Sequence, residues 1–314
     1  MLPEDKVFIA GHTGMVGRAI CRILEGRVQL LKRGRREGLD LCDRKAVREF
    51  FHQERPKFVI DAAAKVGGIA ANNNQPVEFF LQNVTIQNNL IEASADFGVE
   101  KFLFLGSSCI YPKYASQPIS EDALLTGPLE PTNEAYAIAK ISGVRLCQYY
   151  AREYGKNFIS VMPTNLYGPF DNFDLETSHV LPALMRKFHE AKKSGLSQVV
   201  VWGSGTPRRE FLHVDDLALA CVYLMEKYDS PEIVNVGCGE DLTIAEVAEM
   251  MRRVVGFEGE VIFDRSKPDG TPRKVLDVTR IRSLGWQPSI PLEEGLRRTY
   301  AWYLENVELA GRVQ

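Results

Sequence analysis

A hydroxyl, a thiol, a phenol and an amine near the middle of this sequence could together carry out carbonyl chemistry. Ser107 and Cys109 lie in the run Gly-Ser-Ser-Cys-Ile-Tyr-Pro at 106–112, directly after an apolar stretch. Tyr136 and Lys140 are one helical turn apart, so a helix would present both on one side. Ser107, Tyr136 and Lys140 could polarise and protonate a carbonyl, with the ammonium easing proton loss from a phenol of reference pKa about 10. None of these three is an evident base toward carbon, and Cys109 could supply that function.

A glycine-rich loop precedes this group, between an apolar run at 7–10 and a helical pattern at 15–26. Glycines at such a junction allow a tight turn and a close approach of the backbone to a pyrophosphate, while the helix N-terminus favours negative charge. A plain glycine turn would look similar in isolation, but the strand before it and the helix after it favour a dinucleotide site. The candidate cofactor contacts here are Gly11, His12, Thr13, Gly14, Met15, Val16 and Gly17.

The end of the second apolar run indicates which dinucleotide is bound. An acidic residue there would accept hydrogen bonds from a ribose hydroxyl, whereas this chain reads Lys-Arg-Gly-Arg-Arg at 32–36. Arg33 and Arg35 suit the 2′-phosphate of NADP, so the sequence predicts NADP; an exposed basic turn is the alternative. Asp40 and Leu41 could meet the adenine, and Ala63 lies where a strand end would face the cofactor, although either segment could be purely structural.

The composition excludes several classes of protein. A chain of 314 residues that is 45% hydrophobic and 25% charged can bury a large core. Its net charge of −3 comes from interspersed acids and bases, which argues against nucleic acid or anionic lipid as a partner. Six scattered cysteines and five histidines without ligand spacing predict a reducing, cytoplasmic location and no metal site. We find no apolar run long enough to cross a bilayer.

Short apolar runs alternate with helical patterns through the first half of the chain. Strands are expected at 7–10, 28–31, 58–60, 102–105 and 158–161, and helices at 15–26, 43–54, 77–97 and 134–154. This alternation predicts an α/β fold with a Rossmann-type, doubly wound parallel sheet. After Pro163 the pattern changes to loops, a helix at 180–193, a strand at 199–202, a helix from Asp215 and a strand at 233–237.

These later elements predict a smaller α/β lobe that is interleaved with the first. We expect residues 1–165, together with about 212–240, to form the NADP-binding domain. The substrate-binding domain would then comprise mainly residues 166–211 and 241–314. Such a division places the chemistry between the two lobes.

Several longer segments resemble the extended short-chain dehydrogenase/reductase family. The Ser, Tyr and Lys set described above is typical of that family, and the resemblance covers almost the whole chain. It rests on the segments at 62–69, 105–113, 130–134, 162–169, 201–207 and 267–274. One departure is Thr13, where relatives often carry Arg, so the resemblance implies that a phosphate contact is lacking there.

Within that family, the chain is similar to enzymes that act on a GDP-linked keto sugar. The resemblance implies epimerisation of GDP-4-keto-6-deoxy-D-mannose at carbons 3 and 5, then NADPH reduction at carbon 4, giving GDP-L-fucose. Both epimerised carbons adjoin the ketone, so proton removal gives an enolate that Tyr136 and Ser107 could stabilise. The resemblance implies Cys109 as the base, His179 as the acid and Tyr136 as the proton donor during reduction.

The resemblance also implies the remaining contacts. A homodimer is implied through helices 77–97 and 134–154. The expected GDP-sugar contacts are Lys187, Trp202, Arg209, Asp269 and Lys274. The ordinary alternatives are that the charged residues form surface salt bridges and that the tryptophan is buried in the core. Further cofactor contacts are expected at Leu105, Gly106, Ser107, Ser108, Tyr136, Lys140, Pro163, Thr164, Asn165, Leu166 and His179.

Two other functions share much of this pattern. An NAD-dependent sugar-nucleotide 4-epimerase would use the same Tyr136 and Lys140 but would not need Cys109 and His179 as a proton pair. A catalytically silent NADP-binding interaction protein could keep the fold alone, although the intact set of reactive side chains argues against it. Incubation with the keto sugar and NADPH, followed by identification of the product, would separate the three.

Overall fold

A computed structural model describes residues 1–175, 177–267 and 269–308. Three parts of the chain lie outside the described residues: residue 176, Pro268 of the motif at 267–274, and residues 309–314 at the end of the expected second lobe. The first part of the chain forms β1 (Lys6–Ala10), α1 (Met15–Leu24), β2 (Gln29–Leu31), α2 (Arg44–Glu54), β3 (Phe58–Asp61), α3 (Ile69–Asn74), α4 (Pro76–Asp96), β4 (Lys101–Leu105), α5 (Glu134–Tyr154) and β5 (Phe158–Pro163). The rest forms β6 (Asn165–Tyr167), α6 (Val180–Lys193), β7 (Gln198–Trp202), β8 (Arg208–Arg209), β9 (Phe211–His213), α7 (Val214–Lys227), β10 (Val234–Val236), β11 (Leu242–Thr243), α8 (Ile244–Val255), β12 (Glu260–Asp264), β13 (Arg273–Lys274), α9 (Thr279–Ser283) and α10 (Leu292–Tyr303).

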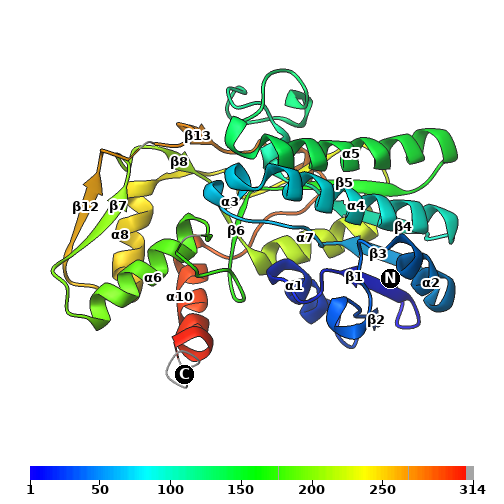
Figure 1. The fold of residues 1–314 in the computed structure, drawn as a ribbon, viewed down its shortest axis with the longest axis horizontal. Coiled ribbons are helices and arrows are strands. Elements are labelled where there is room, and N and C mark those ends of the chain that lie inside the picture. The colour runs from blue at the N-terminus through cyan, green and yellow to red at the C-terminus, as the bar shows by residue number, and fades with distance from the viewer. Residues whose placement is uncertain (176, 268, 309–314) are drawn as a thin grey trace.

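The larger lobe is built on a six-stranded parallel sheet in the order β10-β5-β4-β3-β1-β2 (Figure 1). The predicted Rossmann-type parallel sheet is therefore confirmed. The chain leaves β1 toward β2 on one side and returns to β3 on the other, which makes the β1–β3 boundary the switch point of the sheet. Ligands of such sheets bind beyond the carboxyl ends of the strands at this point.

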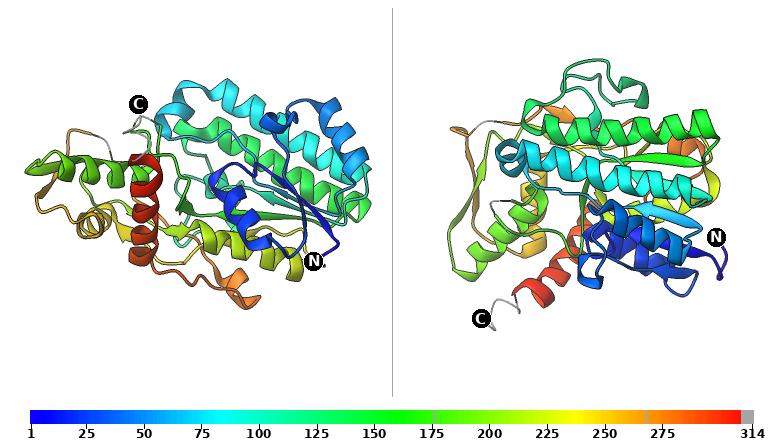
Figure 2. Two further views of the ribbon diagram at one scale, coloured as in Figure 1. Left: turned by 90° about the horizontal axis from the view of Figure 1, so that it is seen from below. Right: turned by 45° about the vertical axis from the view of Figure 1, so that its right-hand side comes forward.

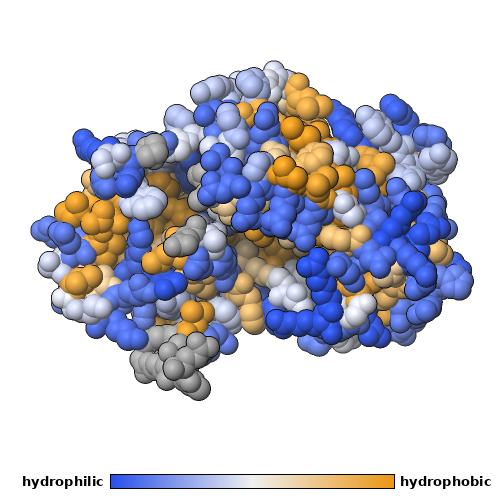
Figure 3. Space-filling view, in the orientation of Figure 1, coloured by the Kyte–Doolittle hydropathy of each residue, from blue (hydrophilic) through white to orange (hydrophobic). Residues whose placement is uncertain are grey.

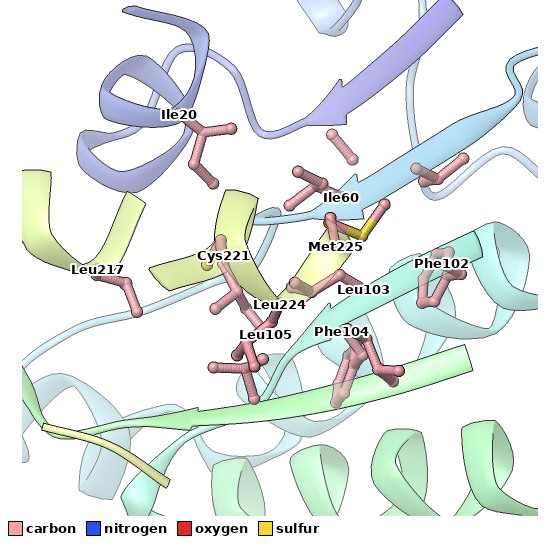
Figure 4. Packing of buried hydrophobic residues seen from close by; sticks show 14 of the residues in the cluster. Ile20, Ile60, Phe102, Leu103, Phe104, Leu105, Leu217, Cys221, Leu224 and Met225 are labelled. Carbon is pink, nitrogen blue, oxygen red and sulfur yellow. The ribbon is translucent and has the colours of Figure 1, made fainter. Parts of the chain in front are cut away.

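Helices cover both faces of this sheet. Helices α1 and α7 pack together on one face, while α2, α4 and α5 lie on the other, with α4 and α5 side by side (Figures 1 and 2). From β4, Leu103 and Leu105 point toward α7, where they meet Cys221 and Leu224, whereas Phe104 points to the opposite face (Figure 4). Alternation along a strand accounts for this two-sided burial, since successive side chains point to opposite faces.

The smaller lobe surrounds a second hydrophobic cluster. Parallel strands β7 and β12 pair with each other, and β8 pairs with β11 and β13 in a three-stranded ribbon. Helices α6, α8 and α10 contribute the apolar side chains between these sheets, among them Phe188, Met251 and Leu296, which are all fully buried. Strand β10 returns to the large sheet beside β5. The domain limits expected above remain a prediction.

The outer sides of α4 and α5 carry apolar side chains that remain exposed, and Figure 3 shows apolar residues gathered over these helices. Val77 and Leu81 on α4, and Ile138 and Tyr149 on α5, are between 43% and 69% exposed. A shallow groove between the two helices is lined by Phe80, Val84, Asn88, Ser142, Arg145, Leu146 and Tyr149. No helix among the described residues has the length and apolar character needed to span a membrane.

Candidate active site

The glycine loop lies at the switch point, and two of its glycines leave no room for a side chain. Gly11 follows β1 with φ +78°, and a Cβ there would lie 2.6 Å from the Ala62 carbonyl oxygen after β3. A Cβ on Gly17 would lie 2.2 Å from the Gly11 carbonyl oxygen. Gly14 caps α1 without any side-chain hydrogen bond, so the first backbone N–H groups of the helix lack a capping side chain. The loop therefore fits a dinucleotide pyrophosphate, with His12, Thr13, Met15 and Val16 lining it.

The basic turn after β2 contains an ion pair that the sequence did not indicate. Arg35 pairs with Asp40 at 3.2 Å, so two expected cofactor contacts bind each other. Glu37 accepts a hydrogen bond from the Gly34 N–H at 2.9 Å and lies 3.6 Å from His12. Arg33 is exposed. The turn thus presents guanidinium groups together with a carboxylate beside the glycine loop.

Ser107, Tyr136 and Lys140 converge beyond the end of β4, as the sequence predicts. The Ser107 hydroxyl accepts a hydrogen bond from the Cys109 N–H at 3.2 Å, which caps a short 3-10 turn after β4. Burial raises the pKa of Tyr136, the charge of Cys109 raises it further, and a hydrogen bond with Ser107 lowers it. The phenol is therefore held against the Ser107 hydroxyl and near the thiol.

Lys140 is buried directly behind Tyr136 in α5. It is only 3% exposed, and its ammonium donates to the Leu105 carbonyl oxygen at 2.7 Å. Burial lowers the pKa of Lys140, and the charge of Asp61 opposes that effect. Tyr136 lies one turn earlier in the same helix, so both side chains extend from the same side of α5.

Cys109 accepts contacts from an amide and an ammonium. Asn133 donates from its side-chain amide to the Cys109 sulfur at 3.4 Å, and the Lys274 ammonium lies 3.7 Å from the same sulfur. Both contacts hold the sulfur in place, and the thiolate is the reactive form of a cysteine. Lys274, expected above only as a substrate contact, therefore also lies beside the candidate base.

His179 stands at the N-cap of α6, close enough to Lys274 for the charge of that lysine to affect it. Burial by the surrounding protein lowers the pKa of His179, and repulsion by the Lys274 ammonium lowers it further. The backbone before it is anchored to the larger lobe, because the Gly68 N–H donates to the Thr177 carbonyl oxygen at 2.9 Å. The structure thus groups the thiol, the ammonium and the imidazole at the junction of the lobes.

The other expected cofactor contacts lie around the carboxyl ends of the strands. Gly106 and Ser108 follow β4, with Ser108 buried. Pro163 ends β5, Leu166 lies in β6, and the Ala63 N–H donates to Asp61 at 3.0 Å. Thr164 and Asn165 both donate side-chain hydrogen bonds to the Glu210 carbonyl oxygen, which joins the strand ends to β8. The Leu41 carbonyl oxygen accepts from Asn89.

The remaining expected substrate contacts lie on the smaller lobe. Trp202 is 66% exposed, so it is not a core residue, and the Lys187 and Lys267 ammonium groups lie 5.2 Å and 5.4 Å from its rings. Asp269 accepts from the backbone and hydroxyl of Ser204 at 2.8 and 2.7 Å. Burial lowers the pKa of Arg209, and the charge of Asp269 opposes this. An exposed aromatic face between cations can receive a planar base.

Three side chains near this site were not singled out from the sequence. Asn133 lies three residues before Tyr136, and that spacing could have suggested it. Asp61 is the last residue of β3, and Glu37 lies at the end of the basic turn. The position of an acidic residue at or after the end of a strand could have drawn attention to them. Among the described residues, no cluster of His, Cys, Asp or Glu side chains could hold a metal ion.

Comparisons with known proteins agree with this geometry. A family model described as the NAD dependent epimerase/dehydratase family matches residues 7–237. The GDP-L-fucose synthase of Escherichia coli (strain K12) is 57% identical over 97% of this chain and 98% of its own length. GDP-L-fucose synthase 1 of Arabidopsis thaliana is 58% identical over 96% of this chain and 94% of its own. The crystal structure of a GDP-L-fucose synthetase from Naegleria fowleri bound to NADP superposes with a TM-score of 0.91, at 36% identity over 98% of this chain and 95% of that one. The chain therefore belongs to the NAD dependent epimerase/dehydratase family, within the extended short-chain dehydrogenases/reductases.

Proposed function

We propose that the protein converts GDP-4-keto-6-deoxy-D-mannose to GDP-L-fucose, by epimerisation at carbons 3 and 5 and reduction at carbon 4. The observation that carries this proposal is the placement of Cys109 within 3.7 Å of Lys274, beside the Ser107 and Tyr136 hydroxyls. A simple carbonyl reductase needs the hydroxyls and Lys140 but has no use for a thiol there. The similarity to GDP-L-fucose synthases over almost the whole chain supports the same reaction.

The epimerisations would use the thiol and the imidazole. The Cys109 thiolate takes a proton from the carbon next to the ketone, and the electron pair of the broken C–H bond moves into an enolate. The Ser107 and Tyr136 hydroxyls donate hydrogen bonds to the enolate oxygen, where the charge collects. His179, when protonated, then gives a proton to the opposite face of that carbon. Before the second inversion, the Cys109 thiol releases its proton to solvent and His179 takes up a proton from solvent.

Tyr136 would serve the reduction. NADPH, when bound, supplies a hydride to carbon 4. Tyr136 donates its proton to the developing alkoxide, which completes the alcohol. The Lys140 ammonium stabilises the phenolate that remains, and a proton from solvent restores the phenol.

The choice of NADPH over NADH is part of this proposal. The guanidinium groups of Arg33 and Arg35 near the glycine loop suit a 2′-phosphate, and the superposed Naegleria structure is described as bound to NADP. The Glu37 carboxylate at this turn would instead repel that phosphate. Steady-state kinetics with both cofactors tests the choice, and a strong preference for NADH would contradict it.

The GDP moiety would lie along the smaller lobe. Trp202 offers its exposed face to the guanine, flanked by Lys187, while Arg209 meets the diphosphate and Asp269 meets the guanine edge or the ribose. Lys274 would face the sugar beside Cys109. These placements follow from the charges and exposure of the side chains described above.

Incubation with the keto sugar and NADPH tests the whole reaction. We expect oxidation of NADPH, formation of GDP-L-fucose by mass and NMR spectroscopy, and deuterium at carbons 3 and 5 in D₂O. Product with the original configuration at carbons 3 and 5 would indicate a reductase alone. Failure to oxidise NADPH with this sugar would remove the proposal.

We further propose that two copies associate through α4 and α5, in the cytoplasm. The exposed Val77, Leu81, Ile138 and Tyr149 on these helices support a homodimer in which four helices pack together. All six cysteines lie in the described residues and are free thiols, which supports a reducing location. Cell fractionation tests the location, and sedimentation tests the dimer.

A further inference from the structure

A carboxyl group that the proposed reaction does not use lies buried beneath the catalytic helix. Asp61 ends β3 and is 0% exposed. Its Oδ1 accepts a hydrogen bond from the Ala63 N–H at 3.0 Å, while its Oδ2 is buried without a hydrogen-bond partner. A buried carboxylate with an unsatisfied oxygen is unfavourable unless an opposite charge lies near it.

The register of the sheet places Asp61 on the same face as Lys140. Asp61 is the direct neighbour of Phe104 on β4, and such neighbours point to the same face. The Lys140 ammonium lies 4.6 Å from the centroid of the Phe104 ring. Figure 4 shows Phe104 on the side of β4 away from Leu103 and Leu105, which is the side that α5 covers. Asp61 and Lys140 therefore lie against the same phenylalanine.

The groups that face Asp61 are few. Helix α5 contributes Lys140, Tyr136 and Cys147, and the charge of Asp61 affects the pKa of each. Among the described residues, the neighbours of Asp61 on the adjoining strands are uncharged: they are Ala10 on β1 and Phe104 on β4, with Ser160 on β5 beyond Phe104.

The charges of Asp61 and Lys140 each stabilise the ionised form of the other. Burial raises the pKa of Asp61 to about 6, and the Lys140 ammonium is the only cation among the described residues that opposes the rise. Asp61 is therefore ionised at neutral pH. Burial lowers the pKa of Lys140, and the Asp61 carboxylate is the first influence that opposes this.

We infer that Asp61 is a positioning residue whose carboxylate keeps the Lys140 ammonium charged behind Tyr136. This inference rests on the proposed reduction, in which that ammonium stabilises the phenolate. Asp61 itself touches neither substrate nor cofactor in this scheme. It acts through Lys140.

The alkaline limb of the pH profile for NADPH oxidation tests the inference. Without the carboxylate, Lys140 loses its proton at lower pH, so in Asp61→Asn we expect the limb to move down by about one pH unit or more. Asp216→Asn is the matched control, because Asp216 is also buried, at 1% exposed, but bonds Ser289 and Ile290 instead. The limb of this control is expected to stay at the wild-type position.

A second measurement does not depend on activity. The ¹³Cε resonance of Lys140, assigned by its loss in Lys140→Met, reports the titration of the amine directly. We expect a lower midpoint in Asp61→Asn and also in Asp61→Ser, which keeps an acceptor for Ala63; near-UV circular dichroism identifies which variant is folded. An unchanged midpoint in a folded variant overturns the inference. A wild-type protein that titrates as expected but does not oxidise NADPH contradicts only the proposed function.

Discussion

The thiol of Cys109 distinguishes this site from that of a simple reductase, and its neighbours come from distant parts of the chain. Asn133 belongs to the turn before α5, and Lys274 is 165 residues away in sequence. An amide and an ammonium on one sulfur fix its direction. The arrangement gives a base on one side of the proposed ketone.

Substitution of Cys109 or His179 provides the most direct test of their proposed roles as base and acid. In Cys109→Ser and His179→Gln we expect deuterium incorporation at carbons 3 and 5 to fall by about 100-fold or more, because acid–base catalysis typically contributes that much. NADPH binding, measured by fluorescence titration, is expected to persist. Exchange at the wild-type rate in both variants would remove them from the mechanism.

Tyr136 allows the two half-reactions to be separated. Tyr136→Phe removes the proton that completes the alcohol but leaves Cys109 and His179 in place. We therefore expect NADPH oxidation to fall by about 100-fold or more, while exchange falls less. Single-turnover oxidation and NMR-detected exchange on the same sample give the ratio. Unimpaired reduction would show that another group donates the proton.

Asp61 makes a pH-dependent contribution to stability. Its pKa rises from an ordinary value of 3.8 to about 6 on folding, so the folded state binds this proton more tightly. The associated stability is present below pH 4 and is lost as pH rises through 6. This loss amounts to about 3 kcal/mol at most, by the free energy equivalent of a pKa change.

Urea unfolding at pH 4.5 and pH 8 measures that contribution. We expect the free energy of unfolding of wild type, relative to Asp61→Asn, to decrease between the two pH values by about 2 kcal/mol, because pH 4.5 already lies above the ordinary pKa of 3.8. Titrations of groups that Asp61 does not influence are common to both proteins and cancel. A difference that stays constant with pH would mean that Asp61 titrates normally in the folded protein.

At the scale of elements, the ribbon of β8 and β13 holds two of the proposed substrate contacts. Arg209 and Lys274 are direct neighbours across these strands, as are Arg208 and Arg273 one residue earlier. Arg208 donates to Asp241 at 2.8 Å and Arg273 donates to its other oxygen. Burial would raise the pKa of Asp241, but the bonds from both arginines lower it overall. A single carboxylate thus joins the strands that carry Arg209 and Lys274.

Loss of this carboxylate is expected to weaken substrate binding. In Asp241→Asn we predict a KM for the GDP-sugar raised about tenfold, since a charged hydrogen bond contributes about 1.5–3 kcal/mol. Glu249→Gln is the control, because its exposed ion pair with Arg252 on α8 contributes little. Calorimetric titration with GDP measures the effect without catalysis. Equal affinities in both variants would contradict a role for Asp241.

The sequence predicted the long elements well because their hydrophobic periodicity is local. The strands β1 to β5 and the helices α1, α2, α4 and α5 begin and end within about two residues of the expected positions. Strands β8 and β13 span two residues each and consist of cations, which have no periodicity to detect. The candidate catalytic residues come from the motifs and remain a prediction, whereas the position of Lys274 beside Cys109 depends on long-range folding of the ribbon.

At the scale of the whole molecule, the surface over α4 and α5 predicts self-association. Leu81→Glu places a charge in the middle of the proposed interface, and we expect it to convert the dimer to a monomer. Leu196→Glu is a matched control, because both leucines are 56% exposed and Leu196 follows α6 on the smaller lobe. Sedimentation velocity at micromolar concentration measures the change. A wild-type monomer would contradict the proposed interface.

One loop connects the first helix of the larger lobe with the last helix of the smaller one. The Arg18 guanidinium lies 4.4 Å from the centroid of the Phe170 ring, and that ring lies 4.7 Å from the ring of Trp302 in α10. Arg18 also donates to the Thr13 carbonyl oxygen in the glycine loop at 2.8 Å. Ordering of the glycine loop by a dinucleotide would thus also restrain α10, so the two lobes would melt in a single cooperative transition.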